Sequence, residues 1–262
     1  MSAVLMQINP IGIFKSKTTT KSALPRQGTL GIHLQGEIEI FSNYVDGIRD
    51  LKGIQRIWII FGFHRNKNWK PMVLPPTSKK KRSVFSTRSP YRPNFLGLTC
   101  CEVLRIQKNY LVVEGADLLD QTPIYDIKPY LPYADSFPKS RTGWIEKEEK
   151  QRFKVVWARS LLQIRKNFEK ENLWNSLHSV EQQLSFHPTD SKRKRVKKTK
   201  VRGVYVFSYR YLRWKFKIHR AQKKITITGL QHAAPQDLTN LKDLDSMTRE
   251  DRVAREIIES KK

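Results

Sequence analysis

The chain has 262 residues, enough for one large domain or for a medium domain with a smaller one. Its 50 lysine and arginine residues outnumber 24 aspartate and glutamate residues, giving a net charge of +26. This balance is typical of proteins that contact polyanions. No stretch approaches the roughly 18 apolar residues of a membrane-spanning helix, and the N-terminus lacks the basic start and long apolar stretch of a signal peptide. We therefore expect a cytoplasmic protein with no membrane partner.

The first half of the chain is rich in predicted β-strands. Short apolar or alternating runs lie at residues 8–14, 32–41, 57–63, 84–87, 98–106 and 110–114. A brief helix is expected at 44–51, and strands at this density predict a barrel or a sandwich. Cys100 and Cys101 are adjacent, a spacing that neither a zinc site nor a disulfide framework uses. We expect them to be reduced and to lie on the two faces of one strand.

The second half begins after a polar connector at 134–142 and has a different character. Residues 158–184 carry apolar side chains at near-helical spacing, which predicts one helix with an apolar face. Aromatic residues largely alternate between Val204 and Ile218, a pattern that favours a β-hairpin. We therefore expect a strand-rich domain over 1–140, a smaller basic α+β domain over 141–232 and a charged tail over 233–262, with a candidate helix at 247–260.

Positive charge is concentrated between Ser191 and Thr226, where fifteen lysine or arginine residues occur without an acidic one. The run 192–200 is predicted to be a mobile basic loop. Because so many like charges repel one another, we expect RNA phosphates to contact Lys192, Arg193, Lys194, Arg195, Lys197 and Lys198. The neighbouring aromatic residues have two interpretations, base stacking or core packing, and we favour packing for most of them. A nuclear-targeting signal is a weaker alternative for the run.

Residues 88–98, Arg-Ser-Pro-Tyr-Arg-Pro-Asn-Phe-Leu-Gly-Leu, combine two guanidinium groups with a rigid turn. Pro90 and Pro93 fix φ and push the preceding residues towards extended geometry. Gly97 can let a ligand or a second backbone come close. A binding loop and an ordinary proline-rich surface loop fit this pattern equally well. The sequence has no dinucleotide fingerprint, phosphate loop, zinc-protease motif or serine-hydrolase motif, and we expect no metal site.

Four patches then occur in a characteristic order: Ile11-Gly12 with Ser16 and Pro25-Arg26-Gln27; Phe63-His64; Arg88 to Leu98; and Asp117 to Pro132. Together they resemble the TrmO (TsaA/YaeB-type) family of S-adenosylmethionine-dependent tRNA methyltransferases. The resemblance covers about residues 7–137 and extends more faintly to 210–214. It implies a mainly β chain, in which a small antiparallel β-barrel at the N-terminus precedes the smaller α+β domain. It also implies a homodimer with sites near the subunit interface.

The resemblance implies methyl transfer to N6 of threonylcarbamoyladenosine at position 37, in the anticodon arm of a threonine tRNA. The residues that it places at the cofactor are Pro25, Arg26, Gln27, His64, Arg65, Arg88, Leu98, Leu118, Leu119, Asp120 and Thr122. By residue type, Asp117 and Asp120 suit the sulfonium and the hydroxyls, and guanidinium groups suit the carboxylate or tRNA phosphates. Arg92 either contacts tRNA or holds its loop.

Methyl transfer requires an in-line approach, so most catalysis is expected from positioning, with help from a base. Asp126 and Tyr130 are the candidate proton acceptors. The structural alternative pairs Asp126 with Lys128 and packs Tyr130 under the loop.

Two positions depart from the family pattern and leave the local cofactor geometry open. Gln121 stands where a glycine is common, and Phe95 stands where a second proline is common. Two other functions also stay open. A non-enzymatic basic RNA-binding β-barrel is favoured by the charge alone, and a methyltransferase with a different substrate would use the same cofactor residues.

Overall fold

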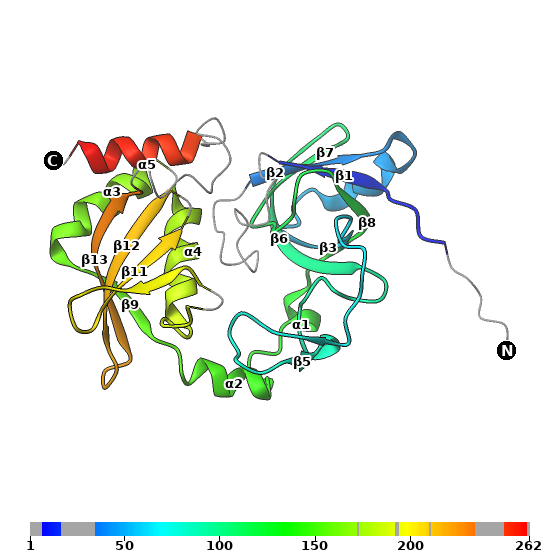
Figure 1. Ribbon diagram of the computed structural model, residues 1–262. Helices are drawn as coiled ribbons and strands as arrows, with labels where there is room; N and C mark the ends of the chain where they lie inside the picture. The colour runs from blue at the N-terminus through cyan, green and yellow to red at the C-terminus, as the bar shows by residue number, and fades with distance from the viewer. Residues whose placement is uncertain are drawn as a thin grey trace. The chain divides into compact units, whose positions relative to one another are not determined.

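The computed structural model describes residues 7–16, 35–171, 173–191, 194–209, 211–233 and 249–260. The chain divides into two compact units, Met1–Ser140 and Arg141–Lys262 (Figure 1). The first is a closed β-barrel and the second combines a five-stranded sheet with helices, which confirms the predicted fold class. None of the helices in the described part of the chain combines the length and apolar character needed to cross a membrane.

Six strands form the barrel: β1 (Gly12–Lys15), β2 (Gln35–Ile40), β3 (Arg56–Gly62), β6 (Leu96–Gln107), β7 (Tyr110–Glu114) and β8 (Thr122–Pro129). They close in the order β1-β2-β7-β6-β3-β8, and all neighbouring pairs are antiparallel. Alternate residues fill the interior, so β3 buries Ile57 and Ile59 and leaves Trp58 partly exposed. The same alternation creates an outer face on β3 and β6.

Cys100 and Cys101 lie on β6 as free cysteines, with Cys101 buried in the barrel core and Cys100 partly exposed. This confirms the predicted placement on two faces of a strand. A two-stranded ribbon of β4 (Met72–Val73) and β5 (Arg82–Ser83), together with the short helix α1 (Pro132–Asp135), completes the unit.

Three elements of the first unit differ from the prediction. Residues 84–87 were expected as a strand, but η4 (Val84–Ser86) is a 3-10 turn because the Thr87 amide and hydroxyl both bond the Val84 carbonyl oxygen. The brief helix is a 3-10 helix, η3 (Ser42–Leu51). Strand β8 was not predicted. Its two prolines, Pro123 and Pro129, lie near its ends, where the loss of a ladder donor is tolerated.

The second unit contains a sheet of β9 (Lys154–Trp157), β10 (Val196–Lys198), β11 (Val204–Tyr209), β12 (Leu212–His219) and β13 (Lys224–His232), in the order β10-β11-β12-β13-β9. Its helices are α2 (Trp144–Glu149), η5 (Arg159–Leu161), α3 (Leu162–Lys170), α4 (Trp174–Ser185) and α5 (Arg249–Glu259). The predicted hairpin is β11–β12, and its Phe207, Trp214 and Phe216 are buried, which confirms the core-packing interpretation.

Two expectations for this unit need revision, and a third is incomplete. The single helix over 158–184 is wrong, because the segment contains the short η5 and two separate helices, α3 and α4. The loop predicted at 192–200 includes β10, which pairs with β11. The charged tail contains the candidate helix predicted at 247–260, which α5 confirms; what the prediction lacked is that α5 buries Ala254, Ile257 and Ile258 in the same core as α3 and α4.

Candidate functional site

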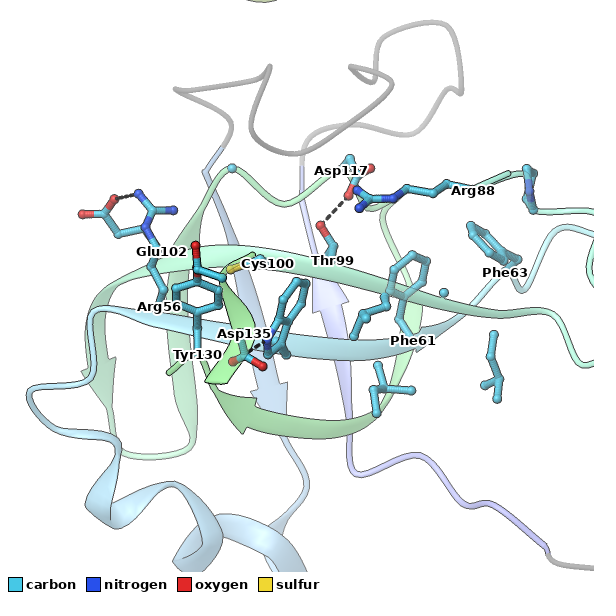
Figure 2. A pocket seen from close by; sticks show the side chains of 18 of the residues that line it. Arg56, Phe61, Phe63, Arg88, Thr99, Cys100, Glu102, Asp117, Tyr130 and Asp135 are labelled. Carbon is cyan, nitrogen blue, oxygen red and sulfur yellow. Dashed lines mark hydrogen bonds and ion pairs between the residues drawn. The ribbon is translucent and has the colours of Figure 1, made fainter. Parts of the chain in front are cut away.

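A groove of about 1210 Å³ lies on the outer face of the barrel. Outward-facing residues of β3 and β6 form its floor. Its walls come from the loop at 87–92, from the end of β7 with the residues after it, and from the segment 130–138. Figure 2 shows side chains from all these segments converging on it. Because the walls are distant in sequence, closure of the barrel is what assembles the groove.

At one end of the groove, Asp117, Thr99 and Arg88 form a polar cluster (Figure 2). The Thr99 hydroxyl donates to Asp117 Oδ1 at 2.7 Å, and the Arg88 guanidinium lies beside the same carboxylate. Burial raises the pKa of the half-buried Asp117 carboxyl, and the Thr99 hydrogen bond and the Arg88 charge offset part of that rise. No group of His, Cys, Asp and Glu residues that could hold a metal ion occurs among the described residues.

The loop that carries Arg88 is held in shape by Arg92. Nη1 of Arg92 donates to the carbonyl oxygens of Thr87 at 2.9 Å and Val84 at 3.3 Å. Its guanidinium lies 5.7 Å from the centre of the Phe85 ring. These contacts favour the loop-holding role of Arg92 over contact with tRNA.

Phe95 and Gly97 fix the end of this loop against β3. Phe95 has a φ of 52°, which a proline cannot adopt, and its carbonyl oxygen accepts the Phe63 N–H at 2.7 Å. Gly97 lies opposite Phe61, and a Cβ at that position would collide with the Phe61 ring. The space at Gly97 is therefore taken by an aromatic side chain that itself lines the groove.

His64, Thr122 and Asp120 form a second cluster near the ends of β3 and β8. The Thr122 hydroxyl donates to the Leu119 carbonyl oxygen at 2.7 Å and lies 3.4 Å from His64 Nδ1. Asp120 Oδ1 accepts the Ser16 N–H at 3.0 Å. The structure thus brings together three predicted cofactor residues from distant segments, outside the groove lining.

Gln121 adopts the left-handed backbone conformation at this cluster, with a φ of 63°. Its N–H donates to the Phe14 carbonyl oxygen at 2.8 Å, which ties the turn to β1. A non-glycine residue pays about 1 kcal/mol for this conformation. The glutamine therefore keeps a turn that glycine would adopt with less strain.

The other predicted cofactor residues differ in accessibility. Leu118 and Leu119 bury their side chains, which leaves backbone groups for a ligand to reach. Leu98 is 57% exposed and lines the groove, and Arg65 is exposed just after β3. Three predicted residues lie outside the described part of the chain: Pro25, Arg26 and Gln27.

The far end of the groove contains Trp58 and Asp135, which the sequence interpretation missed. Trp58 Nε1 donates to Asp135 Oδ2 at 3.0 Å, and the Leu131 N–H donates to the same oxygen at 2.9 Å. The Tyr130 ring lies 5.8 Å from the Trp58 ring, centre to centre. The available signal was a tryptophan at an outward-facing position of an otherwise apolar strand.

The two predicted proton acceptors lie in different environments. Tyr130 lines the groove, whereas Asp126 is not among the lining residues. Asp126 Oδ2 lies 3.1 Å from Lys128 Nζ, and Oδ1 accepts the Ile127 N–H at 2.9 Å. Asp126 therefore has the pairing expected of a structural residue, and Tyr130 is better placed to meet a ligand.

Burial divides the basic run of the second unit. Lys194 is 7% exposed, and its ammonium donates to the carbonyl oxygens of Gln183 and Phe186 at the end of α4. This side chain satisfies the last carbonyl oxygens of a helix, which favours a structural role for Lys194 over the predicted contact with RNA. The exposed members are Arg195, Lys197 and Lys198, and Lys192 and Arg193 lie outside the described residues.

Known proteins similar to this chain fall into two groups by coverage. Residues 13–136 match the family model described as the tRNA-methyltransferase O N-terminal domain. An S-adenosyl-L-methionine-binding protein of Archaeoglobus fulgidus is 38% identical over 130 residues, which cover 50% of this chain and 93% of the relative. A tRNA (adenine(37)-N6)-methyltransferase of Escherichia coli is 29% identical over 223 residues, which cover 80% of this chain and 92% of the relative. The second alignment necessarily extends beyond the barrel unit.

A solved structure shares the fold across both units. The crystal structure of TrmO from Pseudomonas aeruginosa matches with a TM-score of 0.54 and 24% identity, over 87% of this chain and 99% of that chain. At this identity the likeness concerns the fold. The aligned region is longer than either unit of this chain, so the likeness extends over both units.

Proposed function

Because this chain belongs to the tRNA-methyltransferase O family, we propose that it methylates N6 of adenosine 37 in a tRNA, with S-adenosylmethionine as the methyl donor. The observation that carries the proposal is the groove on the barrel, whose lining lies almost entirely within the matched residues 13–136. The chain is accordingly an S-adenosylmethionine-dependent methyltransferase.

The polar groups of the groove fit the methyl donor. A guanidinium at Arg88 suits the amino-acid carboxylate, and the Asp117 carboxylate suits the sulfonium or a ribose hydroxyl. Leu98 and Phe63 provide apolar surface for adenine. We assign further contacts to the second cluster and to the predicted residues around it: Pro25, Arg26, Gln27, His64, Arg65, Leu118, Leu119, Asp120 and Thr122.

The groove is larger than one cofactor needs, because drug-sized ligands occupy pockets of roughly 300–1000 Å³. The end lined by Trp58 and Tyr130 is the place for the target nucleotide, whose base an aromatic side chain can hold. S-adenosylmethionine supplies an electrophilic methyl group. As the bond from the methyl carbon to N6 forms and its bond to sulfur breaks, N6 must lose a proton. We assign the Tyr130 hydroxyl oxygen, rather than the paired Asp126, to accept a hydrogen bond from N6–H, with the proton released to water as the methyl group transfers.

The finer substrate assignment is threonylcarbamoyladenosine in the anticodon arm of a threonine tRNA, acted on by a homodimer. The basic charge of the second unit supports a polyanionic substrate. The threonylcarbamoyl group carries a carboxylate of its own, which one of the cations at the groove, such as Arg56, could meet.

Nucleoside mass spectrometry tests the proposal. Purified protein is incubated with methyl-labelled S-adenosylmethionine and threonine tRNA that either carries or lacks the threonylcarbamoyl group. We expect one labelled methyl group on N6 of residue 37 and only in the modified tRNA. Equal labelling of both tRNAs would remove the threonylcarbamoyl requirement. Cofactor binding without labelling of either tRNA would point to a different acceptor, and RNA binding without cofactor binding would support a non-enzymatic barrel.

A further inference from the structure

In the described part of the second unit, helices pack on one face of the sheet and leave lysine side chains of the opposite face, here called the uncovered face, exposed. Helices α3, α4 and α5 share a hydrophobic core with the packed face, to which Phe207, Trp214 and Phe216 contribute. The opposite face carries the alternate residues of the same strands, and Lys215 and Lys217 are exposed there. Antiparallel sheets commonly expose one face to solvent, so exposure alone does not indicate a binding surface. The side chains on the face must provide that evidence.

The uncovered face consists of cations separated by small or β-branched residues. Cross-strand neighbours in one row are Lys197, Val206, Lys215 and Gly229. Neighbours in the next row are Val204, Lys217, Thr226 and Val156. The five strands contain neither aspartate nor glutamate. The face therefore carries positive charge with no negative charge among its strand residues.

Its lysines differ from cations of the barrel in lacking acidic partners. Within the described part of the chain, Lys197, Lys215 and Lys217 form no ion pair. On the barrel, Lys15 Nζ lies 2.6 Å from Glu39 Oε2. Like charges that share one face of a sheet repel one another, which is unfavourable without a partner. Such an arrangement keeps its full positive potential for a polyanion.

The aromatic residues of these strands point away from the uncovered face. Phe207, Trp214 and Phe216 are buried, and the Tyr205 ring stacks on Phe216 with centres 5.6 Å apart. Sheets that read RNA bases present exposed aromatic rings on which the bases stack. Among the described strand residues of this face, the one aromatic ring is the imidazole of His219 at the end of β12, so the face offers phosphate contacts with little surface for reading bases.

We propose that this uncovered face, centred on Lys197, Lys215 and Lys217, binds the sugar–phosphate backbone of RNA independently of sequence. Charge complementarity indicates that the ligand is a polyanion. Its identification as RNA rests on the proposed function. A membrane surface fits less well, because the face lacks the large apolar side chains that enter the headgroup region. Lys215 and Lys217 are spaced by about 7 Å along β12, and Lys197 lies about 10 Å away across two strands, so several phosphates are reachable at once.

The test compares two variants that each remove three positive charges from the second unit. The face variant combines Lys197→Gln, Lys215→Gln and Lys217→Gln. The helix variant combines Lys147→Gln, Lys166→Gln and Lys170→Gln, which are exposed on α2 and α3. The dissociation constant for tRNA is measured at several salt concentrations, together with S-adenosylmethionine binding, binding to vesicles of anionic lipid, and thermal unfolding as a check on folding.

The face variant should bind tRNA about tenfold or more weakly at low salt, with the slope of log K against log salt reduced by about two to three. This loss should be equal for different tRNAs, and cofactor binding should not change. The helix variant should retain nearly wild-type affinity. Equal losses in the two variants, a loss for one tRNA only, or a loss confined to vesicle binding would each overturn the proposal. Wild-type protein that binds tRNA without methylating it would contradict the proposed function and leave the assignment of this face intact.

Discussion

The groove on the barrel and the uncovered face of the second unit are both built on the outer side of antiparallel strands, yet their chemistry is opposite. The groove mixes charges of both signs, and its Arg56 is paired with Glu102 at 2.9 Å. Among the described residues, Lys197, Lys215 and Lys217 of the uncovered face have no acidic partners, and the phenylalanine, tyrosine and tryptophan rings of its strands belong to the packed face. Fixed, complementary charges select a small molecule, whereas unpaired charges attract any polyanion. The two regions therefore suit cofactor chemistry and RNA capture respectively.

The largest effect is expected from Arg88→Ala in the groove. Loss of a charged hydrogen bond to the cofactor carboxylate should weaken S-adenosylmethionine binding by roughly 10- to 100-fold. Affinity for tRNA should stay close to wild type. Calorimetric titration with each ligand measures both affinities. The matched control is Arg105→Ala, which removes an exposed arginine of β6 that does not line the groove. A loss of tRNA affinity without a loss of cofactor affinity would reverse the roles of the two regions.

A stability change is expected from Lys194→Met, which separates buried from exposed cations in the basic run. The substitution keeps the apolar stem but leaves the Gln183 and Phe186 carbonyl oxygens without this donor, at a cost of about 2 kcal/mol in the free energy of unfolding. Chemical denaturation measures the change, with Arg195→Met as the exposed control. A reduced salt dependence of tRNA binding with unchanged stability would show that Lys194 does reach RNA.

A smaller gain is expected from Gln121→Gly beside Asp120. Glycine adopts the left-handed conformation without strain, so the free energy of unfolding should rise by about 1 kcal/mol. Lys108→Gly, at a φ of 45° in the β6–β7 turn, is the control away from the cofactor residues. An unchanged or lower stability in Gln121→Gly alone would mean that the glutamine side chain stabilises the turn.

The smallest effect concerns pH and Asp117. Burial raises the pKa of its carboxyl in the folded state above the ordinary value of 3.8, so the folded state binds this proton more tightly than the unfolded state does. The free energy of unfolding should therefore fall as pH rises through the interval between these two pKa values. Asp117→Asn removes that dependence. The melting temperature of the variant, relative to that of the wild type, should therefore increase as pH rises across the interval. A constant difference across pH would show that the pKa is not raised.

The sequence was sufficient for much of the barrel, because alternation at 57–63 and 110–114 marks strands with one buried face. It was insufficient where a local signal conflicted with a tertiary role. Strand β8 contains two prolines, which is unusual for a strand, yet Pro123 and Pro129 lie near its ends and β8 pairs on both sides. The apolar spacing over 158–184 continues through both α3 and α4, so it does not reveal where one helix ends and the next begins.

The candidate site shows the same limits. Arg88 and Leu98 were identified through their motif, and both line the groove. Trp58 and Asp135 escaped notice, because their contact joins residues 77 positions apart. The burial of Lys194 could not be foreseen, since lysine is almost never buried unless a partner is present, and its partners lie on a helix earlier in the chain.

The division of roles between groove and face is tested most directly by single-turnover methylation of modified tRNA, with tRNA and S-adenosylmethionine varied independently. The face variant should reach the wild-type rate once tRNA is saturating, needing about tenfold or more tRNA to do so. Arg88→Ala should stay slow at saturating tRNA and recover only as S-adenosylmethionine is raised. The two regions do not have separate roles if raising the same substrate, tRNA or S-adenosylmethionine, restores the methylation rate of both variants. The same conclusion follows if the face variant stays slow at saturating tRNA.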